Sequence, residues 1–384
     1  MKREVSSEQS TVSSQCATPN RGSQLAAARW LLPALILLFS LHAPLPTLQA
    51  QPTHYAFGPT FGTIIATGGS PFNGRSPTAG IDVAALWQQT DTSVFWHRFW
   101  GYPFMGIRAN YAHIWHSPAG HRFGLAGTLQ GPLIGPLHWT YSVGLSAYTR
   151  PYSVTHDTAN IFIGSHLNCL IDIGLLYNLP LSDRLALTAA LKIVHSSNGY
   201  LYKPNHGLNY LQLDIALRYQ AVSSQQPAVS TGRRPLTDPH FSPYGRPFIL
   251  IAPAAVMSRY DPPDSIRFHP AYTLQLGYIR HPHPCFNYGA ALDLSYNFSH
   301  SSQPTAPRLP VYPAATLFGD CLWGPLTLRV GLAHYLHRYP LNWSQYYERV
   351  ALYYRLNPHH MVGVGMKVHD DHIDFVEWSY AFEL

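Results

Sequence analysis

The sequence has 384 residues, of which 11% are charged and 13% aromatic, and its mean hydropathy is −0.08. A typical soluble domain carries about 25% charged residues, so this chain has too little charge to cover the surface of a soluble protein of its size. The net charge of +6 is spread without a basic cluster, and nucleic acid is therefore not expected as a partner. Scattered apolar residues with 25 tyrosines are typical of strands that turn one face to lipid.

The first 50 residues have the pattern of a secretory signal peptide. Basic residues precede the apolar run 30–41, and small residues surround Ala50. An apolar run of this length is too short to span a bilayer, which needs about 20 residues. We therefore expect cleavage near Ala50, with residues 51–384 forming the folded protein.

Apolar and polar residues alternate with a period of two along most of the mature chain. The segments 288–298 and 326–336 show this strand pattern, as does the C-terminal segment FVEWSYAFEL. In lipid, strands satisfy their backbone polar groups only in a closed barrel. The sequence therefore predicts an all-β, transmembrane antiparallel β-barrel of the outer-membrane type. A secreted β-sandwich is the alternative, but its outer face would carry more charge.

About eight strands are expected before Gln220 and six to eight after Arg246. The segment 221–245 between them is rich in Pro and Ser and is predicted to be a long connection. Because no internal repeat is evident, we expect one barrel of about 14 strands, within a range of 12 to 16. This count places the long connection on the periplasmic side, where turns are usually short. Either the strand count is different or the segment is a periplasmic insertion.

The candidate chemistry lies in HSSNGYLYKPNHGLN, residues 195–209, between two strongly alternating strands. In the first strand the apolar residues occupy odd positions, so His195 and Ser197 continue the lipid-facing side while Ser196 points inward. In the returning strand Asn209 shares the outward face, whereas Asp214 faces the lumen. A hairpin would bring His195, Ser197 and Asn209 together where the aliphatic wall ends.

This grouping suits acyl transfer. A histidine next to a serine can take the hydroxyl proton and create a nucleophile, and a third group such as Asn209 can orient the imidazole. Asn198, Asn205 and the backbone near Gly199 are candidate donors to a developing oxyanion. A site on the lipid-facing wall implies a membrane lipid as substrate. The alternative is an interfacial belt in which these side chains only meet lipid headgroups.

The full pattern H-S-S-N-G…K-P-N-x-G-x-N resembles that of the lipid A 3-O-deacylase (PagL) family, outer-membrane β-barrel serine esterases that remove the 3-position hydroxyacyl chain of lipid A. The resemblance implies that His195 is the general base and Ser197 the nucleophile, and that Asn198 and Asn205 belong to the oxyanion region. The family's glutamate falls on Asn209, which can set the imidazole tautomer but supplies no charge. The family's typical member has eight strands, and the resemblance covers residues 185–220 closely and the first eight strands loosely.

The resemblance implies a lipid A deacylase in the outer leaflet of a Gram-negative outer membrane. Its expected partners are lipopolysaccharide as substrate, the surrounding outer-membrane lipids and the barrel assembly machinery; no oligomeric state is specified. Two alternatives remain open. One is a non-catalytic barrel for transport or structure that retains a relic motif, and the other is an acyltransferase acting through the same site.

No cofactor or metal ion is expected. His281, His283 and Cys285 lie close together in RHPHPC, but the alternating prolines favour an exposed turn over a metal site, since no complementary ligand set appears. The isolated spacing of Cys169, Cys285 and Cys321 gives no metal-binding motif, and their disulfide state is left open.

Overall fold

The structure is a computed structural model. The predicted signal peptide, residues 1–50, lies outside the described residues. No helix in the described part of the chain is long and apolar enough to cross a bilayer. The structure describes residues 54–65, 76–115, 117, 119–199, 201–221, 235–257, 268–299, 311–337, 344–369 and 372–384.

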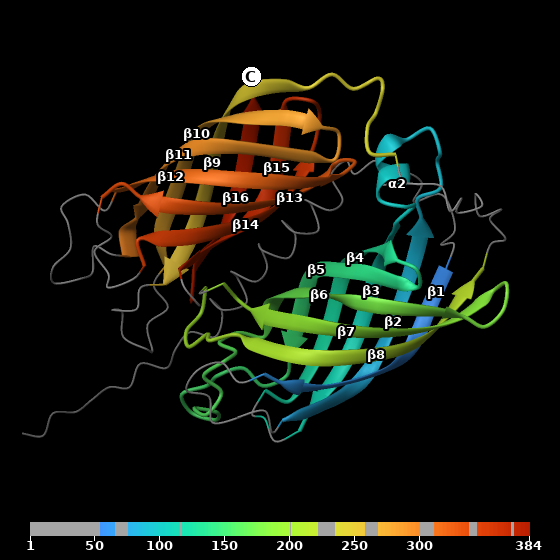
Figure 1. The fold of residues 1–384 in the computed structure, drawn as a ribbon. Helices are drawn as coiled ribbons and strands as arrows, with labels where there is room; N and C mark the ends of the chain where they lie inside the picture. Colours follow the sequence, from blue (N-terminus) through green and yellow to red (C-terminus); the bar gives the residue numbers. More distant parts are fainter. Residues whose placement is uncertain are drawn as a thin grey trace, which may run out of the picture. The chain divides into compact units, whose positions relative to one another are not determined.

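The described residues form two closed antiparallel barrels of eight strands each (Figure 1). A five-residue helix, α2 (Phe95–Phe99), connects β2 to β3. The strands of the first barrel are β1 (His54–Ile64), β2 (Pro77–Gln88), β3 (Phe104–Ile114), β4 (His121–Ile134), β5 (Leu137–Tyr148), β6 (Leu167–Pro180), β7 (Leu185–Ser197) and β8 (Leu208–Gln220). Those of the second barrel are β9 (Tyr244–Met257), β10 (Phe268–His283), β11 (Phe286–Asn297), β12 (Val311–Trp323), β13 (Leu326–Tyr335), β14 (Tyr346–Arg355), β15 (His360–His369) and β16 (His372–Glu383).

The expectation of a single barrel was wrong, although the barrel class was right. Each barrel has eight strands, fewer than the 12 to 16 expected for one barrel, because β8 pairs with β1 and β16 pairs with β9, so each group of eight closes on itself. The long connection 221–245 therefore joins two barrels rather than neighbouring strands of one barrel. The structure describes only residues 221 and 235–245 of this connection.

The alternation predicted from the sequence sets the two faces of each barrel wall. On β7, Leu191 and Ile193 are both 53% exposed on the outside, whereas Lys192 and Val194 between them are buried. On β16, Glu377 is buried and Tyr380 is exposed, as the C-terminal pattern predicted. The outer wall is therefore apolar and the lumen polar, as a membrane barrel requires.

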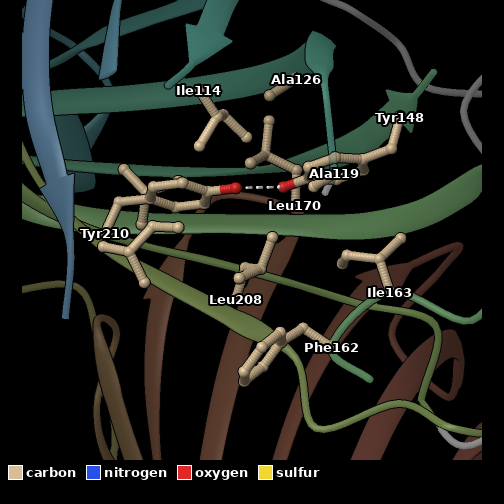
Figure 2. Packing of buried hydrophobic residues seen from close by; sticks show 11 residues of the cluster. Ile114, Ala119, Ala126, Tyr148, Phe162, Ile163, Leu170, Leu208 and Tyr210 are labelled. Carbon is tan, nitrogen blue, oxygen red and sulfur yellow. Dashed lines mark hydrogen bonds between the residues drawn. The ribbon is translucent and has the colours of Figure 1, made fainter. Parts of the chain in front are cut away.

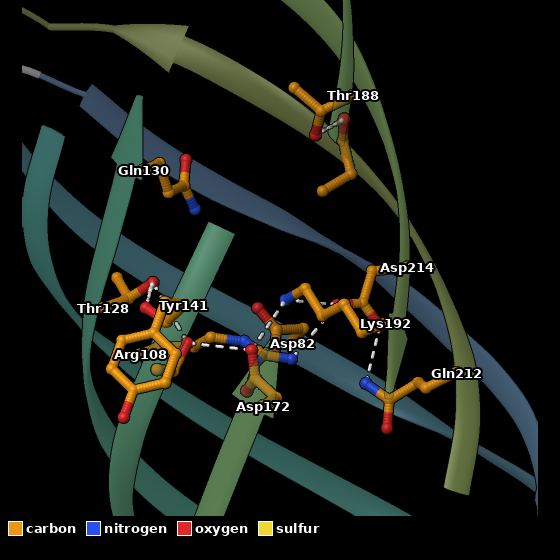
Figure 3. Close-up of polar contacts among 12 residues, drawn as sticks. Asp82, Arg108, Thr128, Gln130, Tyr141, Asp172, Thr188, Lys192, Gln212 and Asp214 are labelled. Carbon is orange, nitrogen blue, oxygen red and sulfur yellow. Dashed lines mark hydrogen bonds and ion pairs between the residues drawn. The ribbon is translucent and has the colours of Figure 1, made fainter. Parts of the chain in front are cut away.

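Ion pairs fill the middle of the first lumen (Figure 3). The guanidinium of Arg108 on β3 contacts the carboxylates of Asp82, Asp172 and Asp214. Lys192 Nζ adds a contact to Asp214 Oδ2 at 2.8 Å. Buried charges of this kind are stable only when paired and hydrogen-bonded, and here two cations face three carboxylates across the barrel.

The second lumen has a network of its own. Arg349 on β14 contacts Asp293 on β11 at 3.2 Å and Glu377 on β16 at 3.0 Å. His281 also points into this lumen, with Nε2 3.3 Å from Glu383 Oε2. The predicted exposed turn at His281 was wrong, because β10 continues to His283 and a register irregularity between positions 280 and 283 accommodates the prolines.

A hydrophobic cluster closes one end of the first barrel (Figure 2). Tyr148 and Tyr210 meet across it with their hydroxyl oxygens 2.8 Å apart. Val194 and Leu208 belong to the same cluster and are each 1% exposed. The strands β7 and β8 are thus packed from inside at the level where the sequence places the candidate site.

Candidate active site

The β7–β8 hairpin places the three predicted residues on one outward face. His195 on β7 lies directly opposite Asn209 on β8 in the strand register. Ser197 is two residues beyond His195 and ends β7, so its side chain leaves the wall on the same side. The sequence-based expectation that these three side chains meet is confirmed by their contacts.

The three side chains form a continuous hydrogen-bonded chain. His195 Nδ1 donates to Asn209 Oδ1 at 2.7 Å, and Ser197 Oγ donates to His195 Nε2 at 2.9 Å. Because an amide oxygen can only accept, the asparagine fixes the hydrogen on Nδ1 and leaves Nε2 free to accept from the serine. This is the tautomer in which a histidine can take a proton from a serine hydroxyl.

The neighbouring serine has a different environment. Ser196 points into the barrel, is fully buried and accepts a hydrogen bond from Ser146 Oγ at 3.2 Å. It pairs with Leu208 in the strand register, on the inner face next to the hydrophobic cluster. The sequence-based assignment of Ser196 to the inner face is therefore confirmed, and Ser197 is the serine that meets the histidine.

Asn198 holds the loop that follows Ser197. Its Nδ2 donates to Tyr202 O at 2.9 Å and to Ser165 Oγ at 3.0 Å, and its Oδ1 accepts from the Tyr202 backbone N–H at 3.4 Å. Its backbone N–H donates to Asn205 Oδ1 at 3.2 Å. The side-chain amide of Asn198 is thus committed to loop contacts, whereas Asn205 Nδ2 makes no hydrogen bond to any described residue.

Two glycines give the loop its shape. Gly199 and Gly207 have positive φ angles of 63° and 75°, which residues that carry a side chain rarely adopt. A Cβ on Gly207 would lie 2.9 Å from His195 Cε1 and 3.4 Å from Ser197 Cβ. The absence of a side chain at Gly207 therefore provides the space that the imidazole of His195 occupies.

The connection between β5 and β6, residues 149–166, packs on the same loop and was not predicted from the sequence. Gly207 N donates to Phe162 O at 3.0 Å, and His206 N donates to Ile161 O at 3.3 Å. A Cβ on Gly164 would lie 2.5 Å from Pro204 O. These contacts join segments about forty positions apart. Gly164 and Ser165 are the residues of this connection whose type could have suggested a close contact with the loop.

No carboxylate in the described part of the chain contacts His195. Asp214, on the same strand as Asn209, faces the lumen as predicted, where it pairs with Lys192 and Arg108 (Figure 3). Among the described residues no group of three or more His, Cys, Asp or Glu side chains is close enough to hold a metal ion. The site is therefore a Ser–His–Asn chain rather than a Ser–His–acid triad.

Closed antiparallel strands with an apolar outer wall and a polar, side-chain-filled lumen define this protein as an outer-membrane-type β-barrel protein. Residues 82–218 match the family "Lipid A 3-O-deacylase (PagL)", and residues 248–384 match "Acyloxyacyl hydrolase, C-terminal domain". The resemblance to the lipid A 3-O-deacylase family is thereby confirmed, and each match falls within one barrel.

Solved structures with likeness to the chain include engineered mutants of the Rh. blastica porin. One such mutant is 13% identical over 86% of this chain and 98% of the porin, with a TM-score of 0.19. A second mutant of the same porin is also 13% identical, with 86% and 99% coverage and a TM-score of 0.21. These scores are too low to support an argument about this protein. A search of the curated proteins finds no match.

Proposed function

We propose that the protein is a lipid A deacylase that hydrolyses an ester-linked 3-hydroxyacyl chain in the outer leaflet of a Gram-negative outer membrane. The observation that carries the proposal is the hydrogen-bonded chain Ser197–His195–Asn209 on the outer wall of the first barrel. The match of residues 82–218 to the lipid A 3-O-deacylase family supports the choice of substrate. We further infer that residues 1–50 direct export and that the barrel assembly machinery inserts the protein.

In the proposed reaction Ser197 Oγ attacks the ester carbonyl carbon while His195 Nε2 takes the hydroxyl proton. The tetrahedral intermediate collapses, the sugar oxygen leaves with the proton from His195, and the acyl chain remains on Ser197. Water, deprotonated by the same imidazole, then attacks this acyl-enzyme. The products are a free 3-hydroxy fatty acid and the serine hydroxyl, which regains its proton from His195.

The oxyanion requires donors near Ser197, and the loop contacts divide the predicted candidates. We assign this role to Asn205 Nδ2 and the backbone near Gly199, because the side-chain hydrogens of Asn198 already bind Ser165 and Tyr202. Asn198 then acts by fixing the loop that carries these donors. Preorganised donors of this kind contribute about 10²–10³-fold each to the rate of acyl transfer.

The position of the site suits a lipid substrate. On the side of His195 away from the loop the outer wall is aliphatic, with exposed Ile193 and Leu191 on β7 and exposed Leu211 on β8. An acyl chain lying along this wall would bring its ester to the level of Ser197, where the strands end. A water-soluble ester would gain nothing from these side chains.

The test is mass spectrometry of lipid A from membranes that contain the protein, the Ser197→Ala variant or the Ser196→Ala variant. We expect loss of one hydroxyacyl chain with the wild type and with Ser196→Ala, whose serine faces the lumen, but not with Ser197→Ala. Recovery of the free fatty acid distinguishes hydrolysis from transfer to an acceptor. Unchanged lipid A in membranes that hold a folded wild-type barrel would refute the proposal.

A further inference from the structure

A second group of titratable side chains lies on the outer wall of the first barrel, at the end of the β3–β4 hairpin. His113 near the end of β3 lies directly opposite His121, the first residue of β4. Tyr111 precedes His113 by two residues and so shares its outward face. The proposed acyl transfer uses none of these residues, because its site is built from β7 and β8.

Two polar contacts of this group meet at one atom, His121 Nδ1. His113 Nδ1 and His121 Nδ1 are 3.3 Å apart, and Tyr111 Oη is 2.9 Å from the same His121 nitrogen. Each imidazole nitrogen has either one hydrogen or one lone pair, so His121 Nδ1 cannot form a full hydrogen bond with both neighbours. A positive ion between the three atoms would satisfy all of them.

The spacing of the two nitrogens suits a tetrahedral metal ion. Zn–N bonds of about 2.0–2.1 Å at a tetrahedral angle place two imidazole nitrogens about 3.3–3.4 Å apart, and the observed separation is 3.3 Å. Tyr111 Oη, 2.9 Å from His121 Nδ1, is the nearest oxygen that could join the two nitrogens as a ligand. The Trp115 ring meets His113 edge-on, with centroids 4.8 Å apart, and restricts the rotation of that imidazole.

We propose that His113, His121 and Tyr111 form a binding site for a borderline divalent metal ion, with Zn²⁺ as the best fit. The two imidazoles are the principal ligands because imidazole nitrogen suits ions of this class. The tyrosine oxygen is the third ligand and water the fourth. The three side chains are only half-buried on the outer wall, so an ion can enter from outside the barrel.

The test uses the full chain, folded in detergent micelles and purified without a histidine tag, in a calorimetric titration with Zn²⁺. We expect one equivalent to bind to the wild type and to the control His156→Ala, which removes an exposed loop histidine. His113→Ala and His121→Ala should each weaken this binding by at least about tenfold. Tyr111→Phe should weaken it less. Absence of a stoichiometric site, or unchanged binding in both histidine variants, would overturn the proposal.

A spectroscopic measurement covers the case in which a histidine variant fails to fold. Cu²⁺ prefers the same imidazole ligands, and its electron paramagnetic resonance spectrum resolves coupling to bound nitrogens. One equivalent of Cu²⁺ on the wild type should show two equivalent imidazole nitrogens. A spectrum without nitrogen coupling, or with the same coupling in folded His113→Gln, would contradict the assignment.

Discussion

Asn209 acts on the proposed reaction through the imidazole of His195. It accepts from His195 Nδ1 and so sets the tautomer, but it carries no charge to stabilise the imidazolium that forms when Ser197 loses its proton. In a serine protease triad, replacing the orienting aspartate by asparagine lowers kcat by about 10⁴-fold because the imidazole takes the wrong tautomer, whereas Asn209 holds the productive tautomer and lacks only the charge. The side chain at this position therefore determines how fast a correctly arranged serine can react.

We predict that Asn209→Asp raises the rate of lipid A deacylation by at least about tenfold, since a carboxylate keeps the acceptor and adds the missing charge. Initial rates on lipid A in mixed micelles measure the effect. Asn209→Leu is the matched control, because it removes the acceptor and should reduce the activity below that of the wild type. A folded Asn209→Asp variant no faster than the wild type would show that the charge is not what limits the reaction.

The arrangement of His195, Ser197 and Asn209 could be predicted from the sequence because it depends only on residues close to one another in the chain. Strand alternation alone places His195, Ser197 and Asn209 on one face, and the register of a hairpin places His195 opposite Asn209. The commitment of Asn198 to loop contacts could not be predicted. It depends on Ser165, 33 positions away, which reaches the site only through the path of another connection.

The strands around the candidate site are held in place by two connections. The β7–β8 loop and the β5–β6 connection hold each other by backbone contacts at Ile161 and Phe162, while the hydrophobic cluster supports the strand ends from inside. Period-two patterning predicts strands well, but it says nothing about how two connections pack together, because their contacts are made by backbone groups and by the side-chain pair Asn198 and Ser165. This is why the strands around the site could be predicted and the neighbouring connection could not.

Gly207→Ala tests how strictly the loop holds the imidazole. The added Cβ would lie 2.9 Å from His195 Cε1, so we expect the deacylase activity to fall at least about tenfold while the barrel still folds. Gly135→Ala is the control, because that turn glycine also has a positive φ, of 53°, but open space around it. Each substitution costs about 1–2 kcal/mol in backbone strain.

Activity and thermal unfolding of both glycine variants should therefore be measured side by side. The two variants should lose similar stability, and only Gly207→Ala should lose activity. Equal activity in the two would mean that the imidazole has room to move, and that the close approach of Gly207 does not position it.

At the scale of the whole molecule, the number of barrels could not be inferred from alternation. A strand that closes an eight-stranded barrel has the same pattern as one in the middle of a larger barrel, since both have one apolar face and one polar face. The feature of the sequence that indicated a second barrel was the connection 221–245, which is too long for a periplasmic turn. Because β8 pairs with β1, the first barrel is complete before this connection begins, and the connection leads to the second barrel.

The filled lumens also bear on the transport alternative. Arg108, Lys192 and their carboxylate partners occupy the first lumen, and Arg349 with Asp293 and Glu377 occupies the second. Eight-stranded barrels have interiors just wide enough for such side chains. We therefore predict that the purified protein in planar lipid bilayers shows no steady ion conductance above that of the bare membrane. Stable conductance steps that depend on the folded protein would favour a pore.

The buried charges on the third and sixth strands have opposite signs in the two barrels. In the first barrel the third strand supplies the cation, Arg108, and the sixth the anion, Asp172. In the second barrel the third strand supplies the anion, Asp293, and the sixth the cation, Arg349. A misassembled barrel that combined the third strand of one with the sixth strand of the other would bury two like charges, at a cost of several kcal/mol. The reversed signs at these two positions therefore disfavour exchange of the third and sixth strands between the two barrels.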